Sequence, residues 1–187
     1  LNRNFRNEGI DRTHNPEFTC LEIYQAYGDM RSMQKLVKRL FHHIAENVFG
    51  TKEFTWMGNT INLDHDWEEI TYENIITKHL GDNWFSNDIS FAVNEAKKRD
   101  VTIDTSMSFQ EITHEIYEKN IEPQLIQPTF VTRLPAYLVP LAKKCPDNEE
   151  FVDVFELIIG GKEIAPAYSE LNDPIDQKNR FNSQVDG

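Results

Sequence analysis

The chain has 187 residues, 39% of them hydrophobic, and a formal net charge of −12, so it is long enough for one domain with a proper core. Phosphate binding needs clustered Lys and Arg, so this acidity argues against a nucleic-acid surface within the segment. No apolar run approaches the ~20 residues of a membrane span, and Cys20 and Cys145 lie far apart outside any C-x-x-C pattern. We therefore expect a cytoplasmic protein of a reducing compartment, with no membrane segment and no metal knuckle.

The N-terminal stretch reads as a strand, a turn and a second strand. F-R-N-E-G occupies residues 5–9, a short polar loop follows, and H-N-P-E-F-T occupies residues 14–19. At a period of two, the second strand, 18–24, places Leu21 and Ile23 on a face that we predict to be core. The opposite face carries Phe18, Cys20, Glu22 and Tyr24, and the partner strand offers Asn4, Arg6 and Glu8 on one face.

The middle of the chain predicts helices and one small hairpin. A helix with the N-cap Asp29 and apolar residues at helical spacing ends at Gly50. Residues 64–69 are acidic and read as a loop. The other predicted elements are a hairpin at 52–56 and 60–63, and short helices at 71–80, 87–99 and 108–120, the last opened by a capping box of Ser108 and Glu111.

The C-terminal part returns to strands. We predict a strand at 129–133, an antiparallel pair at 151–159 and 162–168, and a helix from Pro174 capped by Asp173. Strands, then helices, then strands indicate an α+β fold with an antiparallel sheet flanked by helices. The sequence has no G-x-G-x-x-G or Walker loop, which excludes phosphate cradles of those types.

Two glutamates of the last strand pair are predicted to converge. With a two-residue turn at 160–161, Glu163 pairs with Ile158, Ile164 pairs with Leu157, and Glu163 lies diagonal to Glu156, roughly 7–8 Å away between backbones. Like charges at this range cost stability unless a cation lies between them. Mg²⁺ held by one or two carboxylates together with substrate phosphates is the usual solution.

Two long motifs resemble one family. F-R-N-E-G and H-N-P-E-F-T resemble the second signature motif of class II aminoacyl-tRNA synthetases in its lysyl version. F-E-L-I-I-G-G-K-E-I at 155–164 and A-Y-S-E-L-N-D-P at 167–174 resemble the strand pair before that family's third motif. The resemblance runs the whole length and is weakest at 50–125. The family's first and third motifs resemble nothing here, so it implies an incomplete catalytic domain, 1–187, with roughly 64–125 as a helical insertion.

The resemblance assigns the N-terminal motif to ATP. Arg6 would be the catalytic residue, because a guanidinium can fork onto a phosphate and a carboxylate at once. Glu8 would accept from the adenine amino group, Phe18 would stack on the ring, and His14 and Asn15 would contact the outer phosphates. The alternative for Arg6 is a structural ion pair with Glu8 or Glu22. By the same match, Glu156 and Glu163 would be the Mg²⁺ ligands.

The resemblance also predicts a lysine pocket. A buried carboxylate selects an ammonium group, since a neutral side chain would leave it unpaired. Glu170 would take this role, Tyr24 would share the ammonium, and Glu22 and Tyr168 would complete the pocket.

The chain departs from the family pattern at two positions. Thr13 stands where many bacterial relatives have an Arg, with Arg12 one position earlier, and Pro166 stands where relatives usually have a substrate-contacting Asn. Simple alternation also puts Glu163 and Glu170 on opposite faces, so we predict a bulge, and Pro166 is a natural place for one.

The leading hypothesis is part of a lysine–tRNA ligase that uses ATP, L-lysine, Mg²⁺ and tRNA(Lys) and is a homodimer when complete. The resemblance places anticodon reading in a separate domain, and we expect the 187-residue chain alone to be inactive in adenylation. Two alternatives remain open. One is a paralogue that lysylates a protein such as elongation factor P, and the other is a non-catalytic synthetase-like binding module.

Overall fold

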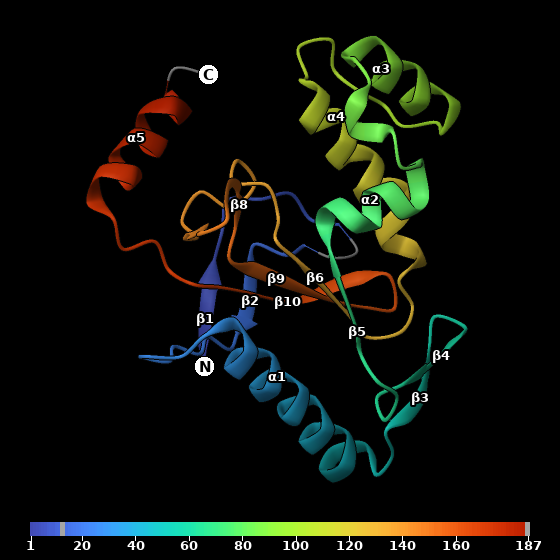
Figure 1. Cartoon of the computed structure of the whole chain (residues 1–187). Helices are drawn as coiled ribbons and strands as arrows, with labels where there is room; N and C mark the ends of the chain where they lie inside the picture. Colours follow the sequence, from blue (N-terminus) through green and yellow to red (C-terminus); the bar gives the residue numbers. More distant parts are fainter. Residues whose placement is uncertain (12–13, 186–187) are drawn as a thin grey trace.

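A four-stranded sheet with helices on both faces forms the centre of the computed structural model, which describes residues 1–11 and 14–185 (Figure 1). The strand order is β10-β9-β6-β5, with β9 antiparallel to both of its neighbours and β5 parallel to β6. The α+β fold is confirmed, and the sheet gains one parallel strand. The bounds are β5 Glu68–Thr71, β6 Thr129–Thr132, β9 Val154–Ile159 and β10 Lys162–Tyr168.

The loop predicted at 64–69 was wrong at its C-terminal end. Residues from Glu68 onward extend along β6, where Ile70 lies opposite Val131. Val131 is fully buried and Ile70 packs against the same core. Burial of this single apolar residue therefore outweighs the acidic composition that suggested a loop.

Helix α1, Met30–Ile44, covers one face of the sheet. The predicted N-cap at Asp29 and the predicted end at Gly50, which has φ 68°, are confirmed. The structure adds a capping box between Asp29 and Ser32 and a π-helical turn, Ala45–Phe49. Val37 packs into a core formed with buried sheet residues, which are Phe130, Phe155, Leu157 and Ile159.

The opposite face carries the larger core and three helices, α2 Tyr72–Leu80, α3 Ile89–Lys98 and α4 Phe109–Ile116. Short turns, Trp84–Ser86, Tyr117–Ile121 and Glu122–Gln124, link them to one another and to the sheet. The predicted capping box at Ser108 is present. Trp84 lies at the centre, where its indole N–H donates to Thr113 Oγ1 at 3.1 Å.

Two small hairpins and a C-terminal helix complete this part of the chain. The hairpins are β3 Glu53–Trp56 with β4 Asn59–Asn62, and β7 Lys144–Cys145 with β8 Asn148–Val152. The strand predicted at 151–159 is divided at Asp153, where β8 ends and β9 begins. Helix α5, Pro174–Val185, begins where the Asp173 carboxylate accepts from the Ile175 N–H at 2.8 Å. Among the described helices, none has the length and apolar character that a membrane crossing requires.

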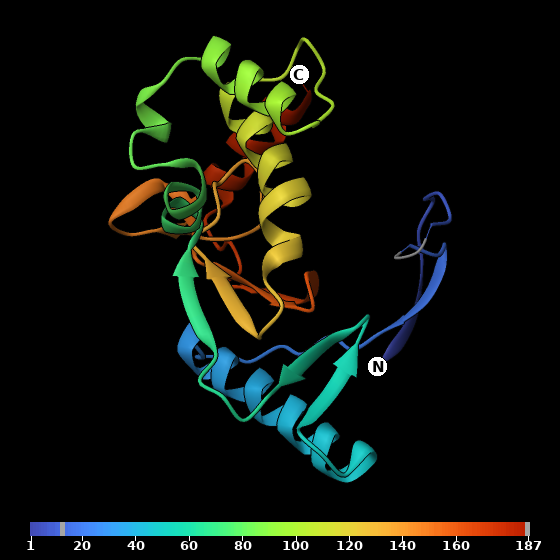
Figure 2. The ribbon, with the colours of Figure 1, turned by 90° about the vertical axis from the view of Figure 1, so that its right-hand side faces the viewer.

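The N-terminal hairpin stands apart from the sheet (Figure 2). Strands β1, Asn2–Phe5, and β2, Glu17–Cys20, pair only with each other. The second strand ends four residues earlier than predicted. Leu21 and Ile23 are 52% and 41% exposed, so the prediction that they face a core was wrong. Period-two alternation marks a face as apolar but does not specify how much of it another element covers.

Candidate functional site

The turn between β9 and β10 sets the position of two predicted ligands. Gly160 and Gly161 have φ of 64° and 72°, as a two-residue hairpin turn of this handedness requires. Glu163 pairs with Ile158 as predicted. The next pair is Ala165 with Leu157, so Ile164 is an extra residue in β10. The bulge is thus two residues earlier than Pro166, and the predicted pairing of Ile164 with Leu157 was wrong.

This bulge resolves the parity conflict seen in the sequence. After it, Pro166 lies opposite Glu156 and Tyr168 lies opposite Val154. Alternate residues of a strand share a face, so Glu156, Glu163 and Tyr168 all face the same side. The intervening residues Phe155 and Leu157 face α1 instead and are completely buried.

The glycine turn is fixed against the end of the helical segment. The N–H groups of Gly160 and Gly161 donate to the carbonyls of Ile126 and Leu125 at 2.9 and 3.0 Å. A Cβ on Gly161 would meet the Pro123 carbonyl oxygen at 2.6 Å. Only glycine allows this approach, which places the segment around Glu122 beside Glu163.

Four carboxylates gather at this junction. Burial and the nearby charges of Glu163, Glu122 and Glu118 raise the pKa of Glu156 to about 8. Burial and Glu118 raise the pKa of Glu163, whose side chain nevertheless remains exposed on one side. Burial, Glu118 and Glu163 raise the pKa of Glu122, although the Glu163 backbone N–H donates to it. Among the described residues, no Lys or Arg pairs with Glu156 or Glu163.

The sequence analysis missed the helical half of this cluster. Glu118 and Glu122 lie four residues apart on the π-helical turn and the segment after it, which is one helical repeat and could have indicated a shared face. Tyr117 is 1% exposed, and its hydroxyl has no hydrogen-bond partner among the residues that the structure describes. Burial, and next the charge of Glu156, raise the pKa of Tyr117, so its hydroxyl stays protonated beside the acids. His114 hydrogen-bonds Glu118 and thereby lowers the pKa of that carboxyl.

On the N-terminal hairpin, the structure brings three predicted ATP ligands together. The Arg6 guanidinium carbon lies 5.4 Å from the centre of the Phe18 ring, and an Arg6 guanidinium nitrogen lies 3.7 Å from a Glu8 carboxylate oxygen. The ion pair with Glu8 is the structural alternative that the sequence left open. The Arg6 side chain is 67% exposed, so the guanidinium remains accessible to a ligand.

The other two predicted ATP ligands lie at the hairpin loop. His14 Nδ1 is 2.9 Å from an Asp11 carboxylate oxygen, and the His14 backbone N–H donates to the same carboxylate. Asn15 accepts from the backbone N–H of Glu17. Arg12 and Thr13 lie outside the described residues.

The predicted lysine-binding residues lie within electrostatic range of one another. Burial, and then the nearby Glu170, Tyr24 and Glu22 side chains, raise the pKa of Tyr168. Glu170 is held by a backbone bridge to Ala142 after β10 ends. Glu170 is exposed, so the prediction that it is a buried carboxylate was wrong, since β10 ends at Tyr168 and leaves Glu170 at the surface. Glu22 is also exposed, and Tyr24 and Tyr168 are 80% and 40% exposed, so these residues form an open acidic surface.

Pro166 occupies the open edge of the sheet. The Ser169 N–H donates to the Asp153 carbonyl, and alternation along the ladder then turns the Pro166 nitrogen away from β9. Proline therefore costs no hydrogen bond with β9 at this position. It does remove a donor from the outer edge, on the face shared with Glu156.

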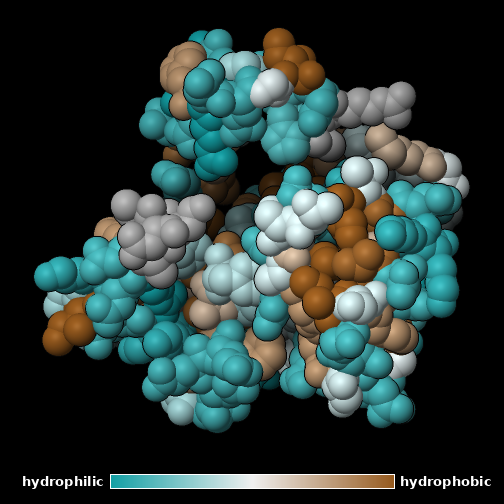
Figure 3. Space-filling model, turned by 90° about the horizontal axis from the view of Figure 1, so that it is seen from above, coloured by the Kyte–Doolittle hydropathy of each residue, from teal (hydrophilic) through white to brown (hydrophobic). Residues whose placement is uncertain are grey.

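The residues predicted to bind ATP on the hairpin make no direct polar contact with those predicted to bind Mg²⁺ or lysine on the sheet. Among the described residues, no hydrogen bond or ion pair joins Arg6, Glu8 or Phe18 to Glu156, Glu163 or Glu170. Seen from above, the molecule is hollowed between the hairpin, at the top of the view, and the remainder (Figure 3).

The acidic cluster is chemically suited to a hard cation with oxygen ligands. Glu156 and Glu163 share a face and lack a basic partner, and their mutual repulsion would fall if a cation bound. In the part of the chain that the structure describes, no group of three or more His, Cys, Asp or Glu side chains could hold a metal ion unaided. The remaining ligands would have to be phosphate oxygens and water.

Comparison with known proteins gives consistent matches over the whole chain. The profile of the family described as tRNA synthetases class II (D, K and N) matches residues 1–186. The chain is 45% identical over its full length to a lysine–tRNA ligase of Carboxydothermus hydrogenoformans, of which it covers 38%. It is 42% identical over 99% of its length to that of Halalkalibacterium halodurans and 40% identical to that of Staphylococcus epidermidis, covering 37% and 38% of them. The chain thus spans little more than a third of these curated relatives.

Proposed function

Because the chain belongs to the class II aminoacyl-tRNA synthetases of the D, K and N group, we propose that it is part of the catalytic domain of a lysine–tRNA ligase. The family uses ATP. The proposal for this protein is that it activates L-lysine and transfers it to tRNA(Lys), acting as a homodimer when complete. Of the insertion that the resemblance places at roughly 64–125, residues Glu68–Thr71 form strand β5, so its helical part would begin at Tyr72.

The residues around Tyr168 support lysine as the substrate over aspartate and asparagine, the other two amino acids of the group. Glu170 and Glu22 place negative charge near Tyr168, together with the phenol of Tyr24. An aspartate side chain would be repelled here, and an asparagine amide would gain no charge attraction from either carboxylate. A lysine ammonium would offset both charges.

The chemistry requires a bond between a lysine carboxylate oxygen and the α-phosphorus of ATP, while the bond from that phosphorus to the β-phosphate oxygen breaks and pyrophosphate leaves. A tRNA ribose hydroxyl then attacks the lysyl carbonyl and AMP leaves. Arg6 would hold the carboxylate and the α-phosphate in line and offset charge on the transferring centre. No side chain needs to act as a nucleophile.

The other residues would position ATP. Glu8 would accept from the adenine amino group, Phe18 would stack on the ring, and His14 and Asn15 would contact the outer phosphates. Glu156 and Glu163 would hold Mg²⁺, which supplies charge neutralisation at the phosphates when bound.

Calorimetric titration with sulfamoyl-adenosine analogues tests this proposal. The lysyl analogue should bind at least tenfold more tightly than the asparaginyl and aspartyl analogues. Glu170→Gln should remove most of that preference, whereas Glu150→Gln, a change of the same type at an exposed position on β8, should keep it. Equal binding of all three analogues by the unmodified chain would refute the assignment of lysine. Binding of none by a longer chain that includes the first and third motifs would favour the non-catalytic module.

A further inference from the structure

The β9–β10 hairpin leaves one backbone donor of a predicted Mg²⁺ ligand outside the sheet. In a hairpin with a two-residue turn, the residues that flank the turn, Ile159 and Lys162, form a hydrogen-bonded pair. The next pair, Ile158 with Glu163, is therefore of the non-hydrogen-bonded kind, and the Glu163 N–H points away from β9. Because β10 is an edge strand of its sheet, the acceptor for this N–H has to come from outside the sheet.

Glu122 supplies this acceptor. Its carboxylate accepts a hydrogen bond from the Glu163 N–H. The bond is formed one residue before Ile164, the extra residue of the β10 bulge. A bulge changes the direction in which neighbouring side chains point. Glu122 therefore holds the backbone at the position that sets the direction of the Glu163 side chain.

Main-chain contacts fix Glu122 beside the turn. The carbonyl oxygen of the next residue, Pro123, lies 2.6 Å from the position that a Cβ on Gly161 would occupy. The Gly161 N–H donates to the Leu125 carbonyl at 3.0 Å. The segment 122–125 cannot move away from the turn without losing these contacts, so the Glu122 carboxylate is held close to the Glu163 N–H.

Tyr117 directs a second polar group from the same helical segment at the acids. Its side chain is 1% exposed, and none of the described residues hydrogen-bonds its hydroxyl. Burial, and next the charges of Glu156 and Glu122, raise the pKa of Tyr117, so the hydroxyl lies near these acids and keeps its proton. A buried donor normally has an oxygen acceptor. A phosphate oxygen beside a cation on Glu156 and Glu163 would provide one.

We propose that Glu122 is a positioning residue for Glu163, which holds the backbone of β10 so that Glu156 and Glu163 face one cation. The proposal rests on the proposed function, because it takes these two carboxylates to hold Mg²⁺ beside ATP. No group of three acidic side chains in the described part of the chain could hold a metal ion, so Glu122 is not assigned as a third ligand. Loss of a group that orients a metal ligand typically lowers metal affinity by about 10- to 100-fold.

The gain in affinity that Mg²⁺ gives to the binding of AMP-PNP, a non-hydrolysable ATP analogue, tests the proposal. Calorimetric titration in Mg²⁺ and in EDTA measures this gain as a ratio of dissociation constants. Glu122→Gln keeps an oxygen acceptor for the Glu163 N–H and loses only a charge, so the gain should fall by less than about fivefold. Glu122→Ala also loses the acceptor, and its gain should fall about tenfold further. The two variants should bind AMP-PNP equally in EDTA, since they lack the same charge.

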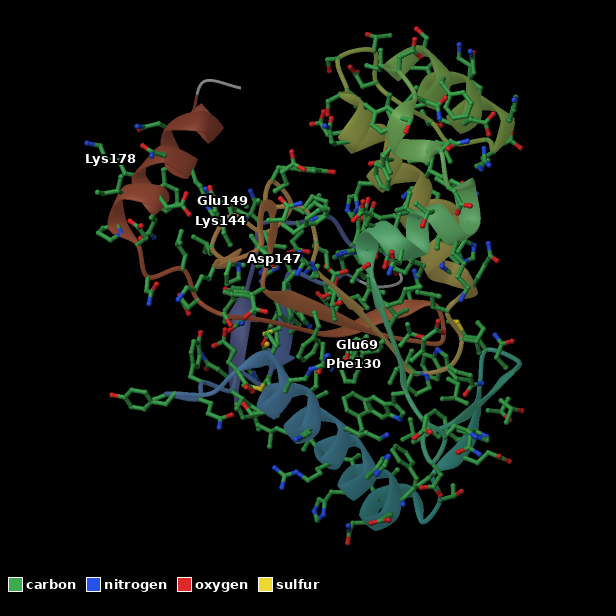
Figure 4. All side chains as sticks on the ribbon, viewed as in Figure 1. Glu69, Phe130, Lys144, Asp147, Glu149 and Lys178 are labelled. Atoms are coloured by element: carbon green, nitrogen blue, oxygen red, sulfur yellow. The ribbon has the colours of Figure 1, made fainter. Side chains whose placement is uncertain are left out.

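Two matched variants separate the effect of position from that of charge. Glu118 acts on Glu163 through its charge, so Glu118→Gln should behave like Glu122→Gln. Glu149 pairs with Lys144 at 3.2 Å, and Figure 4 labels both residues at the β7–β8 hairpin. Glu149→Gln should keep the full gain.

Equal losses in Glu122→Ala and Glu122→Gln would overturn the proposal, because charge alone would then account for both. The absence of any gain with Mg²⁺ in the unmodified chain would also overturn it. Binding of the lysyl analogue in EDTA would then show that the proposed function stood and that the positioning role had failed alone.

A second pair of variants applies if Glu122→Ala does not fold. Glu122→Asp keeps the charge but withdraws the carboxylate by one methylene, so its gain should fall about tenfold. Glu118→Asp, the same change at the acid that acts through its charge, should lower the gain by less than about twofold. Equal gains in these two variants would overturn the proposal.

Discussion

The β9–β10 pair and the β1–β2 hairpin both carry predicted site residues, but they are supported very differently. β9 lies inside a four-stranded sheet between two cores, and Phe155, Leu157 and Ile158 are completely buried. The hairpin forms a separate two-stranded sheet, and Phe5 is 74% exposed. Isolated two-stranded hairpins are marginally stable in water. The carboxylates thus stand on a rigid support, whereas the position of Arg6 depends on few contacts.

The largest effect is expected where the two cores meet the sheet. Phe155→Ala should lower the free energy of unfolding by about 3–5 kcal/mol, since it removes a completely buried ring next to Phe130. Phe5→Ala on the hairpin should change it by less than about 0.5 kcal/mol. Urea unfolding of both variants checks the comparison. Equal losses would mean that the hairpin is packed as tightly as the sheet.

The raised pKa of Glu156 predicts the next largest effect, a pH-dependent change in the free energy of unfolding. Its pKa of about 8 in the folded chain exceeds the ordinary value of 4.5, so the folded state holds the proton more tightly. Stability is therefore fully present below pH 4.5 and falls as the pH rises through 8. At pH 9, Glu156→Gln should be more stable than the unmodified chain, on the order of 2 kcal/mol, because it removes one of four clustered charges.

Thermal unfolding between pH 4 and 9 measures this difference. Glu150→Gln, at an exposed position of β8, serves as the control and should follow the unmodified chain. The gain in stability of Glu156→Gln over the unmodified chain should be larger at pH 9 than at pH 4. An equal gain at both pH values would mean that the carboxylates are not clustered as described.

The β9–β10 turn should be more sensitive to replacement of its glycine by alanine than the β3–β4 turn, whose glycine also has a positive φ. Gly161→Ala forces an alanine into a positive φ and brings its Cβ into a clash with Pro123. We therefore expect the free energy of unfolding to fall by about 1–3 kcal/mol. Gly58→Ala, at φ 83° in the β3–β4 turn with open space around it, should cost only about 1 kcal/mol. Chemical unfolding of the two variants isolates the contribution of the clash, and equal losses would exclude it.

The sequence was most informative where local rules decide the structure. The N-cap at Asp29, the capping box at Ser108 and the turn at Gly160 follow from hydrogen-bonding and φ preferences of a few residues. The parity of Glu163 and Glu170 also required a bulge. Its position could not be predicted, because the Pro166 nitrogen faces away from β9 and its missing N–H places no constraint on that ladder.

Prediction failed where tertiary neighbours decide. Alternation in 18–24 suggested a core face, but Leu21 and Ile23 are 52% and 41% exposed. Glu118 and Glu122 join the acidic cluster only because the glycine turn contacts Pro123, a contact about 38 residues distant in sequence that no local pattern encodes. The roles of the individual site residues remain predictions from resemblance.

The smallest effect on stability is expected for a substitution of Arg6. This substitution also separates most clearly the contribution of a residue to folding from its contribution to ligand binding. Its ion pair with Glu8 is exposed, and exposed pairs contribute about 0–1 kcal/mol, so Arg6→Ala should unfold at nearly the same urea concentration as the unmodified chain. Its affinity for the lysyl-sulfamoyl-adenosine analogue should nevertheless fall at least tenfold, because the guanidinium loses its contact with the sulfamoyl group. Arg3→Ala, which removes a similar exposed pair with Glu17 on the same hairpin, should leave both quantities unchanged. If Arg3→Ala weakened binding as much as Arg6→Ala, the charge of the hairpin as a whole, and not the position of Arg6, would account for the affinity.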